Sequence, residues 1–278
     1  MKKNIPLALV FCIFTMTSCK KDSASAGSPA PTPTTGKCKP LAEPGSISFG
    51  YLPHTYSYHA DGTMESISSP PNETVVTNFS ITRSSPSSLG IPEVYNTETT
   101  EYNADIFTSL PTLAKVSITI DGITQVDYWE YQYTYDSKSR LIKVVESTPH
   151  LTTDLEYMLT ISYSDQDNVT LLTLENTTGP RTPVFIPATG YDDKPGPYSA
   201  IKNPQLFIVG NGWGGEPSLI FEALSKNNPL GFDFDLNHFK RTMVYTYNDN
   251  GYPITRTNTN TNLSGTVTFA ESYTYQCE

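Results

Sequence analysis

A 12-residue frame recurs along this 278-residue chain and constrains its fold more than any other feature. Positions 1 and 3 of the frame are aromatic or apolar, position 4 is a polar residue that starts a turn, and position 9 is usually apolar. Alternation places positions 1 and 3 on one face of a strand, and position 9 returns beside them on the partner strand. Each copy therefore predicts a β-hairpin. The copies are "YSYHADGTMESI" (56–67), "YTYDSKSRLIKV" (133–144), "ISYSDQDNVTLL" (161–172) and "YTYNDNGYPITR" (245–256), with a half copy, "YTYQ", at 273–276.

The turn positions of the frame carry residues suited to tight turns. Asp, Asn and Gly supply local hydrogen bonds and accept positive φ. The frame resembles the YD repeat of Rhs- and teneurin-type surface proteins, "YxYDxxGRLxxI", which residues 133–144 match nearly throughout. The irregular spacing of the copies favours hairpins joined into one meandering sheet over a regular repeat shell. Position 7 is Gly62, Ser139, Asp167 or Gly251, and position 9 is Met64, Leu141, Val169 or, as an exception, Pro253.

Two further stretches carry a second resemblance. "YDDKPGPYSAIKNP" (191–204) and "SKNNPLG" (225–231) are similar to a recurring segment of Bacteroidota lipoproteins of unknown function. In that family, YD-like hairpins flank a short insert, and the architecture is an antiparallel, porin-like sheet. The resemblance implies the same fold and an outer-membrane location, and it implies no catalytic residues.

The rest of the chain fits an all-β fold, a large antiparallel meander of hairpins. We expect an open or partly closed barrel-like sheet, formed by a single domain (38–278) with an insert at about 180–239. "FDFDLNHF" (232–239) alternates as a strand, and its oxygen-bearing face raises calcium binding as an alternative to a solvated surface. Asp121 and Gly122 predict a tight turn. Further strands are expected at 73–83, 93–103, 113–121, 123–135 and 265–276, and one short helix at 217–225.

The first residues of the chain predict export and lipid anchoring. A basic start, an apolar run and small residues up to Cys19 are typical of a secretory signal (1–18). The small residues ending in Cys19 resemble a bacterial lipobox, in which that thiol is acylated. Residues 19–37 are rich in Ser, Pro and Thr and predict a disordered tether. We expect an outer-membrane lipoprotein, facing the periplasm or, as we favour, the cell surface.

Two cysteines remain for the domain, because Cys12 leaves with the signal and Cys19 takes the lipid. Cys38 lies where the tether ends, and Cys277 is the penultimate residue. Thiols of an exported domain are usually paired, so we expect a disulfide between them. A metal site would need neighbouring His or acidic partners that are not nearby in sequence.

The charge of the chain disfavours nucleic acid as a partner. Loss of residues 1–18 removes two lysines and moves the formal net charge from −10 to −12. An acidic chain repels phosphate backbones, and solubility alone accounts for such a charge.

Catalytic and metal-binding motifs are absent from the sequence. No HExxH spacing, GxSxG elbow or paired Cys and His stands out, and "GNGWGGE" (210–216) lacks the Lys and Ser/Thr of a phosphate loop. We expect no cofactor, no resident metal and no enzymatic activity. A hydrolase would need two carboxylates that converge in a cleft.

The function predicted from the sequence is therefore binding or assembly in the cell envelope. Exposed aromatic rings can stack on sugars, so Trp213, Tyr131, Tyr133 and Tyr135 are candidate glycan-binding residues. The alternative for these tyrosines is that they hold the sheet together, and the alternative for Trp213 is a cap over the end of the sheet. The competing function is a structural or assembly partner of another envelope protein, which should expose apolar side chains.

Overall fold

The structure is a computed structural model. The contacts within the chain separate residues 1–32 from residues 33–278, and the described residues all belong to the second unit. They are 37–43, 54–69, 71–86, 95–149, 156–178, 182–201, 217–234 and 238–277.

Strands dominate these residues, and they contain a single helix, α1 (Pro217–Leu224). The strands are β1 (Cys38–Glu43), β2 (His54–Tyr58), β3 (Met64–Ser69), β4 (Asn72–Val76), β5 (Ser80–Pro86), β6 (Tyr95–Tyr102), β7 (Leu113–Ile120), β8 (Ile123–Tyr135), β9 (Leu141–Ser147), β10 (Glu156–Tyr163), β11 (Val169–Asn176), β12 (Val184–Pro195), β13 (Asn227–Phe234), β14 (Phe239–Tyr247), β15 (Pro253–Asn262), β16 (Gly265–Ser272) and β17 (Thr274–Cys277).

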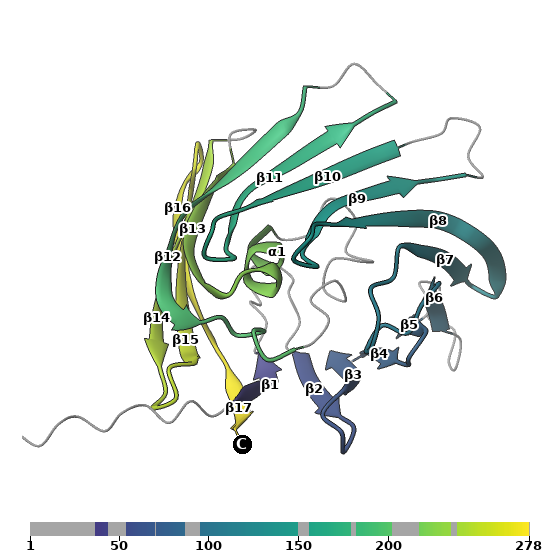
Figure 1. The fold of residues 1–278 in the computed structure, drawn as a ribbon, viewed down its shortest axis with the longest axis horizontal. Helices are drawn as coiled ribbons and strands as arrows, with labels where there is room; N and C mark the ends of the chain where they lie inside the picture. Colours follow the sequence, from purple (N-terminus) through teal and green to yellow (C-terminus); the bar gives the residue numbers. More distant parts are fainter. Residues whose placement is uncertain are drawn as a thin grey trace, which may run out of the picture. The chain divides into compact units, whose positions relative to one another are not determined.

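The strands form one antiparallel, 17-stranded sheet that is nearly closed into a barrel (Figure 1). Each strand from β1 to β15 pairs with the next one along the chain. The last two strands have different partners: β16 pairs with β15, and β17 pairs with β1. The predicted all-β meander with a barrel-like sheet and at most one short helix is confirmed.

All four predicted hairpins form, and they share one register. Position 1 pairs with position 12, and position 3 pairs with position 9 across a small irregularity in the ladder. In each turn, the N–H of position 4 donates to the carbonyl of position 8, over 2.8 to 3.0 Å. Position 7 adopts positive φ, as the frame requires, in Gly62 (82°), Ser139 (65°), Asp167 (63°) and Gly251 (83°).

The two faces of the sheet differ in polarity. Side chains at positions 1 and 9 of the frame are buried, and they form the core together with the inward faces of the other strands. α1 packs on the buried face of β13, where the rings of Phe221 and Phe232 stack 5.5 Å apart. The outward faces carry many threonines, and several pair across neighbouring strands. These hydroxyl pairs are Thr82–Thr99, Thr119–Thr124, Thr246–Thr255, Thr259–Thr268 and Thr261–Thr266.

Three predicted strands are divided in the structure. Residues 73–83 form β4 and β5, because the Thr77 hydroxyl accepts the N–H groups of Phe79 and Ser80 and makes a turn without Gly or Pro. The single strand predicted at 232–239 is also wrong, since Phe234 of β13 pairs with Phe239 of β14. The strand predicted at 265–276 breaks between β16 and β17.

Other predicted elements are found close to their expected bounds. Strand β8 has the predicted limits, the tight turn at Asp121 and Gly122 joins Ile120 to its partner Ile123, and α1 fills the predicted helix. Of the predicted insert, β12 and β13 are strands of the sheet, and residues 196–226 connect them.

Candidate functional site

The tyrosines predicted to bind a ligand lie in or near the core. Tyr131 and Tyr133 are each 4% exposed, and Tyr135 is half-buried. The Tyr135 hydroxyl donates to the main-chain carbonyl of Pro111 over 2.8 Å, and burial raises the pKa of Tyr135 to about 12. These rings therefore pack within the sheet. Their binding role stays a prediction, and Trp213 lies outside the described residues.

At position 3 of the frame, tyrosine hydroxyls donate hydrogen bonds to residues outside their own hairpin. The Tyr58 hydroxyl donates to Pro40, and that of Tyr163 donates to Leu141, the residue at position 9 of the preceding copy. In the last copy, Tyr247 donates instead to the carboxylate of Asp192. Desolvation raises the pKa of each of these three tyrosines, so the hydroxyls stay protonated donors. The position 3 side chains thus hold the turn end of the sheet together.

A buried ion triad fixes α1 to the inner face of the sheet. The Arg256 guanidinium on β15 contacts the carboxylates of Glu222 on α1 and Glu271 on β16. Its Nε lies 2.6 Å from Glu271 Oε2, and the Asn258 side chain donates to the same oxygen over 2.9 Å. All four side chains are buried. Charges can be buried at tolerable cost only when they are paired in this way.

A second arginine extends this polar surface along β14. Arg241 Nε donates to Asn260 over 2.6 Å, and its Nη1 donates to the Ser218 hydroxyl on α1 over 3.1 Å. The guanidinium also lies 5.5 Å from the ring centre of Phe232, within cation–π range. We call the inward residues Arg241, Arg256, Asn258, Asn260 and Glu271 the polar wall.

The polar wall was not predicted from the sequence. "RTNTNTN" (256–262) alternates two polar residue types, so polarity alone does not say which set faces inward. The sequence signal that could have identified the inward face is the charged residue in this run. Arg256 lies on the same face of the strand as the two asparagines that are buried beside it. The two carboxylates do converge here, but both are buried and bound to the same guanidinium. In the described residues, both carboxylates are thus engaged in ion pairs.

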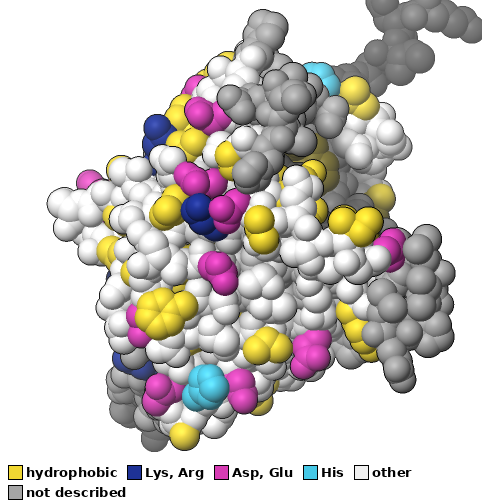
Figure 2. Space-filling view, turned by 90° about the vertical axis from the view of Figure 1, so that its right-hand side faces the viewer, with side chains coloured by type: hydrophobic (Ala, Val, Ile, Leu, Met, Phe, Trp, Pro, Cys, Tyr) yellow, Lys and Arg dark blue, Asp and Glu magenta, His cyan; other side chains and the backbone are white. Residues whose placement is uncertain are grey.

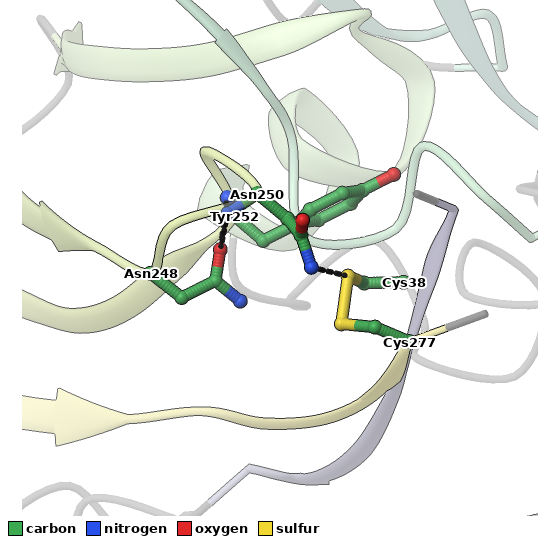
Figure 3. Close-up of a disulfide and its surroundings, with 5 residues drawn as sticks. All are labelled: Cys38, Asn248, Asn250, Tyr252 and Cys277. Atoms are coloured by element: carbon green, nitrogen blue, oxygen red, sulfur yellow. Dashed lines mark hydrogen bonds between the residues drawn. A yellow bond between two sulfur atoms is a disulfide. The ribbon is translucent and has the colours of Figure 1, made fainter. Parts of the chain in front are cut away.

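The predicted disulfide is confirmed. Cys38 of β1 and Cys277 of β17 are bonded across the ladder that closes the sheet (Figure 3). The Asn250 side chain, in the turn of the last frame copy, donates to Cys38 Sγ over 3.5 Å. The same turn is held by Asn248, which accepts the N–H of Tyr252 over 2.9 Å. The last hairpin therefore packs against the closing bond.

The described residues contain no group of three or more His, Cys, Asp or Glu side chains placed to hold a metal ion. No helix among them is long and apolar enough to cross a membrane.

Comparisons with known proteins show the fold alone. No protein family model matches this chain, and no curated protein does. Among solved structures, a porin-like protein from Bacteroides uniformis ATCC 8492 is similar, with 15% identity and a TM-score of 0.53 over 89% of this chain and 100% of that one. A porin-like protein from Bacteroides vulgatus ATCC 8482 gives 8% identity and a TM-score of 0.47 over 86% and 99%.

Proposed function

We propose that this chain is a non-catalytic cell-envelope lipoprotein that presents a filled, water-exposed barrel-like domain to another envelope protein. The lipid on Cys19 would hold it at the outer membrane. The observation that carries the proposal is the polarity of the sheet, whose inward face is packed and whose outward face is rich in hydroxyl groups.

The packed interior argues for binding or assembly over transport, although the similar Bacteroides proteins are described as porin-like. Side chains that line a water-filled channel remain exposed to water. Here the inward residues of opposite parts of the sheet, such as Tyr56, Leu159 and Met243, are all buried. α1 adds its own buried residues to the same core. These residues therefore line no channel.

The outward face supports a domain that contacts water. Five threonine pairs cross four strand ladders on this face, and a half-solvated antiparallel sheet shows this kind of alternation. On the side shown in Figure 2, apolar side chains form separate spots among polar side chains and backbone. Such a surface suits an anchored domain better than one embedded in lipid.

We favour an assembly role over glycan capture because of where the tyrosines lie. A ring must expose its face to stack on a sugar. Tyr131 and Tyr133 are buried, whereas several aliphatic side chains are exposed, among them Ile123 and Leu263. The exposed aliphatic side chains of the described residues therefore suit an assembly role, because they can contact a partner protein.

Lipid labelling and fractionation of intact cells test this proposal. Labelled palmitate should enter the full chain, Cys19→Ser should lose the label, and the matched control Cys12→Ser should keep it. A chain with residues 1–19 replaced by a cleavable secretory signal should then appear in the soluble periplasmic fraction. Binding of this unlipidated chain, once purified, to protein-free lipid vesicles would overturn the proposal, because the sheet itself would then be held by lipid.

A further inference from the structure

One turn of the repeated hairpin frame carries a chemically reactive pair of residues. Positions 6 and 7 of the last copy are Asn250 and Gly251, in the turn between β14 and β15. Asparagine loses ammonia most readily before glycine, because glycine has no side chain to hinder attack by its own backbone nitrogen. The other three copies have Asp–Gly, Lys–Ser and Gln–Asp at these positions. Among the four copies, the last one therefore combines a side-chain amide with a following glycine.

Three hydrogen bonds of this turn hold the groups that would react. The backbone N–H of Gly251 donates to the carbonyl of Asn248 over 2.9 Å, and that of Asn250 donates to the Asn248 side chain over 3.0 Å. The side-chain Nδ2 of Asn250 donates to Cys38 Sγ over 3.5 Å (Figure 3). The first bond engages the nitrogen that would attack, and the third engages the group that would leave. Reaction therefore requires this turn to open locally.

The hydrogen bond to sulfur depends on the disulfide. Sulfur is a weak acceptor, and the position of Cys38 Sγ beside the turn is fixed by its bond to Cys277. These two cysteines form the outermost pair of the β1–β17 ladder, so the disulfide ties the beginning of β1 at this point. Reduction would leave this end of the ladder held by weak bonds alone, and the ends of strands open first. The Asn250 amide would then lose its hydrogen bond to sulfur.

We propose that Asn250 is a site of deamidation and that the Cys38–Cys277 disulfide restrains the reaction. The backbone nitrogen of Gly251 attacks Cγ of Asn250, and a bond forms between these two atoms. The bond from Cγ to Nδ2 breaks, and Nδ2 leaves as ammonia with the proton of the Gly251 amide. Water then opens the resulting cyclic imide at either carbonyl, which gives aspartate or isoaspartate. No electrons are exchanged in these steps.

Either product changes how the last hairpin contacts the closing bond. A carboxylate has no proton to donate to Cys38 Sγ, so the hydrogen bond drawn in Figure 3 is lost. Isoaspartate also adds a carbon to the main chain, directly before a glycine that has a φ of 83°. The added atom displaces the groups whose hydrogen bonds close this turn. The modification thus loosens the sheet beside the disulfide.

Incubation of the full-length protein in detergent, with and without a dithiol reductant, tests the proposal. A mildly alkaline pH is used, because it favours loss of the backbone amide proton. Trypsin then releases residues 242–256, and mass spectrometry measures the fractions of asparagine, aspartate and isoaspartate in this peptide. Conversion at Asn250 should be slow in the oxidised protein and severalfold faster after reduction. The double variant Cys38→Ser with Cys277→Ser should match the reduced protein in the absence of reductant.

A matched turn separates this local effect from general unfolding. Lys138→Asn with Ser139→Gly places the same pair at positions 6 and 7 of the second copy, whose turn has equivalent hydrogen bonds to Asp136. This turn joins β8 to β9, which pair with neither β1 nor β17, so its conversion should not respond to reduction. Equal acceleration at both turns would mean that the domain unfolds as a whole. That result, or an Asn250 rate that reduction leaves unchanged, would overturn the proposal.

Discussion

Two walls of the same sheet bury opposite kinds of side chain. The polar wall on β14–β16 buries arginine, asparagine and glutamate against α1. On β9–β11, Val144, Leu159 and Leu172 are almost fully buried, and we call these three the apolar wall. Both walls contain a copy of the same hairpin frame with the same register.

This difference shows that the residues that shape the sheet and the residues that fill its interior have different determinants. The frame fixes turns and pairing wherever it occurs, and the inward residues then adapt to what packs on them. The polar wall faces a helix that carries a buried carboxylate, so it must supply the countercharge. Hydrophobic packing is nondirectional, whereas an ion triad accepts α1 in one orientation only. The polar wall thereby selects a position for the helix.

The largest expected effect comes from breaking the ion triad. Arg256→Met leaves the carboxylates of Glu222 and Glu271 buried without a countercharge and should lower the free energy of unfolding by about 3–5 kcal/mol. Urea denaturation followed by tyrosine fluorescence measures this. The triple variant with Glu222→Gln and Glu271→Gln added should recover most of the loss. A single variant as stable as the parent would show that the triad is not closed in solution.

A cavity in the apolar wall should lower the free energy of unfolding slightly less than loss of the ion triad does. Leu159 is fully buried, and Leu159→Ala removes its contacts with both neighbouring strands, for a loss of about 2–4 kcal/mol. The same denaturation experiment checks this value. Leu159→Met, which keeps the volume, is the control and should cost less than about 1.5 kcal/mol. Equal losses for the two variants would point to a loosely packed wall.

Substitutions at position 7 of the frame compare the β8–β9 turn, which leads into the apolar wall, with the β14–β15 turn of the polar wall. Ser139 has a φ of 65°, so Ser139→Gly should stabilise the β8–β9 turn by about 1 kcal/mol. Gly251→Ser should destabilise the β14–β15 turn by a similar amount, since an added Cβ finds only ordinary contacts there and the cost is conformational. Thermal unfolding of both variants measures the shifts. Changes of the same sign would contradict a shared turn geometry.

The smallest expected effect is a dependence of the free energy of unfolding on pH, to which only the turns of the apolar wall should contribute. The backbone N–H of Arg140 lowers the pKa of Asp136, and the Lys138 ammonium lowers that of Asp167. Both carboxylates therefore add stability above their unfolded pKa, near 3.9, and lose it as the pH falls through the lower folded pKa. The last copy has uncharged Asn248 and Gly251 at the corresponding positions 4 and 7 of the frame.

Stability measured between pH 2 and 7 checks this expectation. Asp136→Asn with Asp167→Asn should flatten the acid limb of the curve, while Asn248→Ala should lower the whole curve without changing its slope. An unchanged acid limb in the double variant would contradict the assignment.

The sequence predicts the hairpins well because their determinants are local. Alternating residues, a polar residue that starts the turn and a residue tolerant of positive φ lie within twelve positions of each other. The division at Thr77 was missed because its turn depends on a side-chain hydroxyl and contains no Gly or Pro. The polar wall was missed for a different reason. A strand with polar residues on both faces acquires an inside only when the sheet curls and α1 packs on it.

The pairing of β1 with β17 has a consequence for how the protein is made. Cys38 and Cys277 are separated by 239 residues, so the ladder that closes the sheet joins strands from the two limits of the domain. Contacts this distant in sequence form slowly, because the loop that they close must be ordered first. Until β17 pairs with β1, the sheet is open between these two strands. The sheet is therefore most exposed to aggregation before this ladder forms, and formation of the Cys38–Cys277 bond marks the end of that period.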